Sequence, residues 1–441
     1  MAFFRCGGNV GKNSLILPDN IEALNIFKDD KRVIIFWDVP ESSEIEIEKF
    51  NIYYCKAESL PGTLEDFTYY TSVGKDIRTC EITPLENDVN YYFVVESVSV
   101  EDYENASLRG SNKACTKDTE IVLSNSSKYY YSKNGIEWTE QSADVAVSKI
   151  KYVNDRWISI STTCNTTTSY YQNSEYLHKI VGTLYYSFDS VSWVTVNFTV
   201  KEYTDTSTSS GETDELLDNV EYINGMYAIV SYKNGMILTK DFKEFTYQFF
   251  PYYHESSSDR DDCYFYKVGN YIVSANHRQN SLYTGGHLRI FNNDFQIIED
   301  ISLNDYGSAV EDTLFLFAKY TFGMYFCARG TLYYINGKNG TVTVIAKFDK
   351  GKRISSMFVD EKYVYYIQYS TWKWYRALLG DTEFTEIGKG NKNFNLYNVI
   401  TIGDKWIARN WNTVMYSKKD ISNWIKTIEA SSIFMDAKGG Y

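Results

Sequence analysis

Aromatic side chains that could stack on sugar rings lie in four long polar insertions and in several short loops of this chain. The insertions are residues 162–182, 201–218, 251–262 and 276–286, and each is rich in polar residues. Planar rings on exposed loops can cover the apolar face of a sugar and offer hydrogen-bonding edges. The side chains expected to contact a ligand are Tyr170, Tyr171, Tyr252, Tyr253, Trp372 and Trp411. Closely spaced aromatics such as Trp372 and Trp374 equally suit packing in a core.

Other patterns that could carry chemistry are weaker. Asp259, Asp261 and Asp262 could offer oxygens to Ca²⁺, but the DxDxDG spacing is absent and a solvated acidic loop is favoured. Gly11 and Lys12 suggest a phosphate loop, yet the hydroxyl residue that must follow is missing. The seven cysteines include no CxxC and predict free thiols rather than a zinc site. We therefore expect no metal and no cofactor.

The elements that must position these side chains repeat along the chain. Two short aromatic strands around a polar turn recur as YYYSKNGIEW (129–138), LYYSFDSVSW (184–193), ILTKDFKEF (237–245) and VMYSKKDISNW (414–424). Weaker copies begin near Leu288, Leu332 and Trp372. The starts lie roughly 40 to 55 residues apart, the period of four-stranded propeller blades. Residues 120–441 are predicted to form a seven-bladed β-propeller.

The strand order also predicts how the ring closes and where its loops lie. SSIFMDA (431–437) supplies the innermost strand that the first blade lacks, and such closure removes exposed strand edges. All four insertions fall between the second and third strands of a blade or between blades, so they share one face. Loops gathered on one side of a rigid scaffold are the usual place for recognition.

Residues 19–117 show a different pattern, in which apolar and polar residues alternate over short segments. This pattern is typical of an antiparallel sandwich of about 100 residues. Trp37 on the second strand, and the run Ile82, Thr83, Pro84 and Leu85 followed by Tyr91, resemble fibronectin type III domains. The resemblance implies a spacer or docking module. Residues 1–18 are predicted to be an extended attachment arm. The fold class expected is therefore all-β, a fibronectin type III-like sandwich followed by a propeller closed by its C-terminal strand.

The hairpin turns S-x-N-G-x-x-W and S-x-D-S-x-x-W are similar to Asp-box motifs of sialidase-like propellers, one residue shorter than usual. We expect Asn134 and Asp189 to satisfy turn amides while the tryptophans pack between blades. A glycan hydrolase is the enzymatic alternative. It would need a carboxylate pair or a Tyr and Glu system, and the twelve arginines cannot be aligned with the inward positions of that family.

Composition limits the partners. The chain has 441 residues and a net charge of -13, which disfavours nucleic acid because that affinity comes mainly from Lys and Arg. No apolar stretch is long enough for a membrane span, and the start of the chain lacks the apolar run of a secretory signal. The chain is expected to be synthesised in the cytoplasm.

The MAFFRCGG start, the fibronectin type III-like segment and the YSxDG-type repeats together resemble tail proteins of phages, prophages and phage-tail-like bacteriocins of Gram-positive bacteria. The resemblance implies a non-enzymatic component of a virion or tail particle. Its N-terminal arm and sandwich would bind other tail or baseplate proteins, and the propeller loops would bind a cell-surface glycan or protein. Particle symmetry allows an oligomer. The alternatives are a structural baseplate component without receptor contact and a sialidase-like hydrolase.

Overall fold

The structure is a computed structural model in which the placement of most of the chain is described. The described residues are 2–3, 21, 23–29, 31–38, 46–59, 61–100, 104–107, 112–115, 119–125, 128–142, 145, 149–154, 156–160, 164–170, 176–200, 203–205, 213–215, 217–231, 235–249, 261–278, 286–303, 316–320, 323–328, 330–348, 354–369, 371–390, 396, 398–410, 413–429 and 434–438.

The chain divides into two compact units, Met1–Thr119 with Lys438–Gly440 and Glu120–Ala437 with Tyr441. Both units are built from antiparallel strands, and the 3-10 turn η1 (Leu64–Asp66) is the one helical element among the described residues. In the described part of the chain no helix is long and apolar enough to cross a membrane. The predicted fold class is confirmed: a sandwich is followed by a seven-bladed propeller.

The first unit is a sandwich of two antiparallel sheets. One sheet has the strand order β2-β3-β6, and the other has the order β1-β8-β7-β4-β5, with β9 also paired to β7. The strands are β1 (Ala2–Phe3), β2 (Ala23–Asp29), β3 (Arg32–Asp38), β4 (Ile47–Lys56), β5 (Thr68–Gly74), β6 (Thr79–Ile82), β7 (Asn90–Ser99), β8 (Glu104–Ser107) and β9 (Asn112–Cys115). The alternating sequence of β4 explains its place, because Phe50 and Ile52 are fully buried between the sheets.

The residues that carry the resemblance to fibronectin type III domains occupy the expected positions. Trp37 is 1% exposed and packs edge-on against Phe50, with ring centroids 5.5 Å apart. The Tyr91 hydroxyl accepts the backbone N–H of Glu86 at 3.2 Å, a link that fixes the corner leading into β7. Trp37 therefore belongs to the core of the sandwich, and Tyr91 braces the corner before β7.

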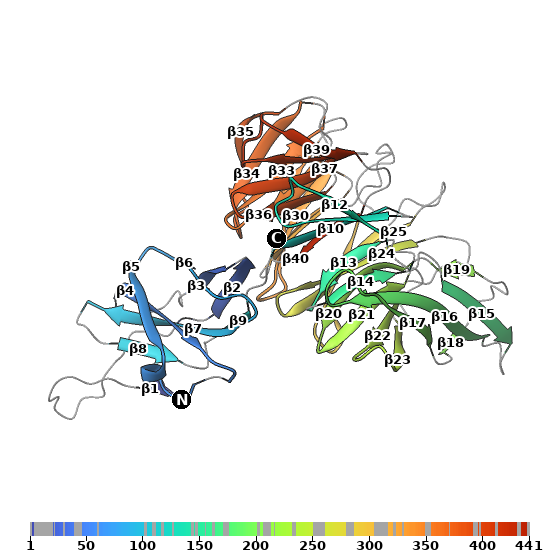
Figure 1. Ribbon diagram of the computed structural model, residues 1–441, viewed down its shortest axis with the longest axis horizontal. Helices are drawn as coiled ribbons and strands as arrows, with labels where there is room; N and C mark the ends of the chain where they lie inside the picture. Colours follow the sequence, from blue (N-terminus) through green and yellow to red (C-terminus); the bar gives the residue numbers. More distant parts are fainter. Residues whose placement is uncertain are drawn as a thin grey trace. The chain divides into compact units, whose positions relative to one another are not determined.

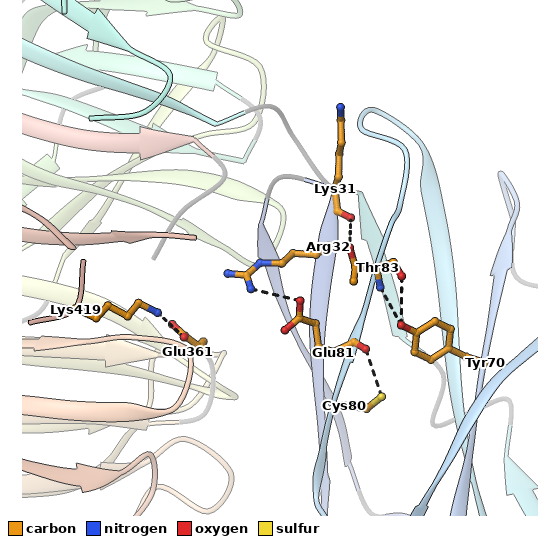
Figure 2. A network of polar contacts seen from close by, with 8 residues as sticks. All are labelled: Lys31, Arg32, Tyr70, Cys80, Glu81, Thr83, Glu361 and Lys419. Carbon is orange, nitrogen blue, oxygen red and sulfur yellow. Dashed lines mark hydrogen bonds and ion pairs between the residues drawn. The ribbon is translucent and has the colours of Figure 1, made fainter. Parts of the chain in front are cut away.

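A second tyrosine joins the two sheets of the sandwich. The Tyr70 hydroxyl on β5 accepts the N–H of Thr83 and donates to the Thr83 carbonyl, both at 3.3 Å (Figure 2). On the neighbouring strands β3 and β6, Arg32 forms an ion pair with Glu81 at 3.5 Å. One side chain thus ties the edge strand β5 to the opposite sheet.

The predicted attachment arm lies mostly outside the described residues. Its described part is β1, where Ala2 pairs with Ser107 and Phe3 with Ala106 on β8. These two residues therefore belong to the sandwich instead of extending away from it.

The second unit contains seven sheets, the blades of the propeller. The first strand of each of blades 2 to 7 is innermost, and β40 takes this place in blade 1. Blade 1 has β40 (Phe434–Lys438), β10 (Glu120–Asn125), β11 (Lys128–Ser132) and β12 (Thr139–Gln141); blade 2 has β13 (Ile150–Val153), β14 (Arg156–Ile160), β16 (Tyr176–Ser187) and β17 (Val194–Thr199). Blade 3 has β20 (Leu217–Ile223), β21 (Met226–Ser231), β22 (Gly235–Thr239) and β23 (Phe245–Phe249); blade 4 has β24 (Asp261–Val268), β25 (Tyr271–Arg278), β26 (Gly286–Phe291) and β27 (Ile297–Ser302). Blade 5 has β28 (Leu316–Tyr320), β29 (Gly323–Ala328), β30 (Thr331–Asn336) and β31 (Val342–Lys347); blade 6 has β32 (Ile354–Val359), β33 (Tyr363–Gln368), β34 (Lys373–Leu378) and β35 (Thr385–Lys389); blade 7 has β36 (Asn398–Ile402), β37 (Lys405–Asn410), β38 (Thr413–Ser417) and β39 (Ile425–Glu429).

The predicted closure by the C-terminal strand is confirmed. β40 is the innermost strand of blade 1 and lies against β10. The amide of Asn398 on blade 7 donates to the Met435 carbonyl at 2.8 Å, and Asp436 accepts the backbone N–H of Tyr152 on blade 2 at 2.6 Å. The closing strand is therefore fastened to both neighbouring blades as well as to its own.

Neighbouring blades are held together by buried clusters, which close the ring pair by pair. Large apolar residues alternate on the middle strands, so each blade offers one apolar face to each neighbour. Six of the seven blade pairs share a buried cluster, with members Tyr129 and Trp157, Ile158 and Ile229, Met236 and Phe265, Val273 and Phe326, Phe358 and Trp406, and Ile121 and Ile407. Blades 5 and 6 are joined by the hydrogen bond from the Tyr325 hydroxyl to the Asp381 carbonyl.

The Asp-box-like turns have the predicted structural role. In blade 1 the Asn134 side-chain oxygen accepts the N–H groups of Ile136 and Glu137 at 2.9 and 3.0 Å. In blade 2 Asp189 accepts those of Val191 and Ser192 at 2.9 and 2.7 Å. These oxygens satisfy turn amides that no strand can reach.

The tryptophans of the same turns pack on the preceding blade. Trp138 donates its ring N–H to Thr427 of blade 7 at 3.2 Å. Trp193 lies edge-on to Tyr129 of blade 1, with centroids 6.5 Å apart. Each turn thus contributes to the contact between blades.

Candidate functional site

The strand order places the strand ends that the four insertions connect on one face of the propeller. Residues 162–182 and 276–286 join the second and third strands of blades 2 and 4, whereas residues 201–218 and 251–262 lead to the next blade. We call the face that carries these two classes of connection the insertion face. The opposite face carries the first-to-second and third-to-fourth turns, and we call it the turn face.

Two insertions expected to be loops contain strands instead. β15 (Cys164–Tyr170) pairs with β16 and with β19 (Thr213–Glu215), and β18 (Tyr203–Asp205) also pairs with β16. Blade 2 is thereby extended into a seven-stranded sheet, visible in Figure 1 as the arm of green strands beyond β14. The Thr-rich run before Tyr170 was the available signal, because β-branched residues favour strands.

The structure describes part of the predicted ligand site. Tyr170 ends β15, where its backbone pairs with that of Tyr176. Trp372 lies in the connection between β33 and β34, on the insertion face. The other predicted residues lie outside the described ones: Tyr171, Tyr252, Tyr253 and Trp411.

Trp372 forms an aromatic pair with Tyr369. Their ring centroids are 5.8 Å apart and the rings are tilted by 43°. Tyr369 is 39% exposed, and Trp372 is half-buried against the core between blades 6 and 7. We call these two side chains the aromatic ledge. Sequence reasoning found Trp372 but missed Tyr369, although the two are separated by only two residues.

The backbone of the ledge is held rigidly. Trp372 has φ = 58°, a left-handed conformation that costs a bulky residue about 1–3 kcal/mol. Its N–H donates to the Gln368 carbonyl and its carbonyl accepts the Gly390 N–H, both at 2.9 Å. The Thr371 hydroxyl bonds the Gln368 side chain at 2.7 Å. The loop therefore presents its rings with little conformational freedom left to lose on binding.

Trp374, also near a predicted short loop, is a core residue. It is 2% exposed and stacks on Trp406 with ring centroids 5.9 Å apart, and Trp424 completes the cluster. Of the two roles considered for closely spaced aromatics, ligand contact and core packing, Trp374 has the second.

A charged network lies inside the ring. Lys151 of blade 2 and Lys319 of blade 5 both contact Glu221 of blade 3, at 3.6 and 2.9 Å. Burial opposes ionisation of Glu221, but the two ammonium groups outweigh it and lower its pKa. Asp436 on the closing strand is also buried, which raises its pKa, while Lys151 opposes that shift. Because each of these charges faces an opposite charge, the network serves to hold inner strands together.

Blade 4 carries a second charged cluster near the insertion face. Asp300 on β27 bonds Nδ1 of His287 at 2.7 Å and Nε of Arg289 at 2.8 Å, and the Arg289 side chain is 4% exposed. Burial opposes ionisation of Asp300, but the hydrogen bonds from these two partners lower its pKa. A carboxylate on Nδ1 fixes the orientation of an imidazole. The alternating H-L-R pattern of β26 was the sequence signal for this cluster.

The acidic loop considered for Ca²⁺ has little described structure. Asp259 lies outside the described residues, and Asp261 and Asp262 begin β24. Within the described residues there is no group of three His, Cys, Asp or Glu side chains that could hold a metal ion.

Comparisons with known proteins add likenesses of fold only. No protein-family model matches the chain, and no curated protein matches it. Among solved structures it is similar to a quinonprotein alcohol dehydrogenase-like protein from Bacteroides thetaiotaomicron, with 9% identity over 95% of this chain and 99% of that one and a TM-score of 0.35. It is also similar to YCF48 bound to D1 peptide, with 10% identity over 64% and 87% and a TM-score of 0.37. The third fibronectin III domain of a human protein matches with 18% identity over 26% and 94% and a TM-score of 0.21.

Proposed function

We propose that this chain is a non-enzymatic recognition protein whose propeller binds a bacterial cell-surface glycan or protein through its insertion face. The observation that carries the proposal is that the strand ends connected by the four long insertions lie on the same face as the aromatic ledge. Strand ends fixed by a closed ring hold such loops in place, and ligand sites concentrate on loops of this kind.

The geometry of the ledge favours a sugar as the ligand it contacts. Two tilted rings can cover the apolar face of a pyranose while the Tyr369 hydroxyl meets its hydroxyl groups. The rigid backbone at Trp372 lowers the entropy lost on binding. The same two rings would also suit an aromatic or aliphatic side chain of a protein receptor, which is the second ligand that we consider.

We further propose that the chain works in a virion or in a phage-tail-like particle. This part rests on the resemblance of the leader, the sandwich and the repeats to such tail proteins. In this arrangement the sandwich with its N-terminal arm binds other tail or baseplate proteins, while the propeller faces the host cell.

The test compares the full chain with ledge variants on a glycan array and in adsorption to bacterial cells. Tyr369→Ala and Trp372→Ala should each weaken binding by about 1–3 kcal/mol, which is roughly 5- to 150-fold in Kd. Tyr69→Ala, which removes a 54% exposed ring from the sandwich, is the matched control and should bind as the parent does. Thermal melting of each variant separates lost contacts from lost folding.

The outcomes separate the alternatives. Unchanged binding by both ledge variants would contradict the role of the ledge. A full chain that adsorbs to no cell and no glycan would favour the structural baseplate interpretation. Release of free sugar from a bound glycan would favour the hydrolase.

A further inference from the structure

A guanidinium group on the turn face lies among four aromatic rings. The guanidinium carbon of Arg156 is 5.3 Å from the ring centroid of Tyr186, 4.8 Å from that of Phe188, 5.6 Å from that of Tyr227 and 5.2 Å from that of Phe242. The arginine and the first two rings come from the turn-face end of blade 2, and the other two rings come from that of blade 3. We call these five side chains the arginine box.

The inner rings of the arginine box are fixed by their own contacts. Phe242 stacks on Tyr186 with ring centroids 4.9 Å apart, and its centroid lies 4.6 Å from that of Tyr227. Tyr227 and Phe242 are 2% and 5% exposed. The Tyr227 hydroxyl donates to the carbonyl of Asn154 at 3.1 Å, in the turn that leads to Arg156. A cation held in this way loses little conformational freedom when a ligand binds.

The hydrogen-bond donors of Arg156 remain available. Attraction to aromatic faces uses the charge of a guanidinium but none of its five N–H donors. Among the described residues no oxygen accepts a hydrogen bond from this side chain, and no carboxylate pairs with it. The carboxylate that follows Phe188, Asp189, serves its own turn, where it accepts the N–H groups of Val191 and Ser192.

Apolar surface lies beside this cation. Phe188 is 60% exposed, although it packs edge-on against Tyr186 with ring centroids 5.9 Å apart. On the blade 3 side, Tyr222 is 37% exposed and its ring centroid lies 5.1 Å from that of Tyr227. Packing between blades alone would not require an exposed phenylalanine at this turn. The arginine box therefore offers a ligand one positive charge next to an aromatic face.

We propose that the arginine box binds the carboxylate of an acidic sugar, such as a hexuronic acid. The fork of N–H groups on a guanidinium matches the two oxygens of a carboxylate. The apolar C–H face of the same sugar ring can then lie on Phe188.

The charges favour a ligand with a single carboxylate. Arg156 is the one cation that the described residues place over these rings, and one cation balances one carboxylate better than it balances a phosphate dianion. The net charge of -13 works against a highly acidic partner. This site does not rest on the proposed function, because the aromatic ledge lies on the insertion face.

Binding of glucuronate to the full chain tests the proposal, with Kd measured in a saturation-transfer NMR titration. Arg156→Gln removes the charge and the fork but keeps a polar side chain. Phe188→Ala removes an exposed ring, so the fold should survive it. Arg376→Gln is the matched control, because Arg376 lies over a single ring, that of Tyr363 at 4.5 Å, in blade 6. Glucose, N-acetylglutamate and inorganic phosphate are titrated in parallel.

We expect the parent and the control to bind glucuronate and to leave glucose unbound. Arg156→Gln should raise the Kd at least about tenfold, because the charge-assisted hydrogen bonds are lost. Phe188→Ala should raise it by about two- to tenfold and weaken saturation transfer to the C–H protons of the sugar. A parent that does not bind glucuronate overturns the proposal, and so does an Arg156→Gln variant that binds it like the parent. Tighter binding of N-acetylglutamate or of phosphate would overturn the assignment to a sugar, in favour of a peptide carboxylate or of a phosphate.

Discussion

Removing the Met435 side chain should test whether the closing strand holds the ring. Met435 is 4% exposed and packs among Ile121, Ile400 and Ile407, so it joins the strand of blade 1 to blade 7. Replacing a buried Met by Ala costs about 2–5 kcal/mol, through lost transfer energy and the cavity left behind. We expect Met435→Ala to destabilise the propeller within this range.

The size of the propeller converts this free energy into a melting shift. With about 2.1 cal/mol/K of unfolding entropy per residue over roughly 320 residues, each kcal/mol lowers Tm by about 1.5 °C. Met435→Ala should therefore lower Tm by about 3–7 °C. Tryptophan fluorescence is the suitable probe, because Trp37 is the only tryptophan before the propeller.

Two further variants make the result interpretable. Ile425→Ala removes an apolar side chain that is 47% exposed, and its effect should stay within about 0.5 kcal/mol. Asn398→Ala removes the hydrogen bond to the Met435 carbonyl and should cost about 1 kcal/mol. If Met435→Ala loosens the whole closing strand, Asn398→Ala should cost less when added to it. A melting curve for Met435→Ala that matches that of Ile425→Ala would refute closure by this strand.

Three other predictions concern single polar groups. Asp189→Ala should destabilise the propeller by about 1–2 kcal/mol in urea unfolding, because two turn amides lose their acceptor. The Asp189 carboxylate, with a folded pKa of about 2, should stabilise the parent above about pH 4, and this stabilisation should be lost as pH falls toward 2. Asp189→Asn should lack this pH dependence, and equal pH profiles of the unfolding free energy in parent and variant would contradict the prediction. Burial raises the pKa of Asp436 in the folded chain. The unfolding free energy of the parent should therefore fall relative to that of Asp436→Asn as pH rises from about 4 through the raised pKa. A difference in unfolding free energy between the two proteins that stays constant across pH 4–7 would contradict this prediction. Tyr91→Phe should lower the unfolding free energy of the sandwich by about 1 kcal/mol, measured by calorimetry of its transition. An unchanged transition would show that the corner hydrogen bond does not stabilise the sandwich.

Local sequence patterns predicted much of the fold. The turns around Asn134 and Asp189 were predictable because a side-chain oxygen two residues before an amide can satisfy it in any hairpin. Closure was predictable because the first blade had three strands after Glu120 and one apolar strand remained at the end. The corner at Tyr91 was predictable because its partner, Glu86, is only five residues away.

Contacts between distant segments could not be predicted in this way. Lys319 meets Glu221 across 98 residues, and neither sequence neighbourhood marks the other as its partner. The aromatic ledge depends on the left-handed backbone of Trp372, a conformation that sequence propensity argues against. The strands in the blade 2 insertion were missed because the long β16 extends beyond the blade and gives them a partner.

The proposed binding through the aromatic ledge is limited by the affinity of a single site. Two rings that contribute about 1–3 kcal/mol each give a dissociation constant between tens of millimolar and tens of micromolar. A site of this strength recognises a surface glycan but does not hold a particle on a cell. Linking two such sites can raise the apparent affinity by about 10²–10⁴ without a new contact, provided that both can reach their ligands. Assembly in a symmetric particle would supply that second site. Loss of this assembly should therefore reduce adsorption to cells far more than affinity for the isolated glycan.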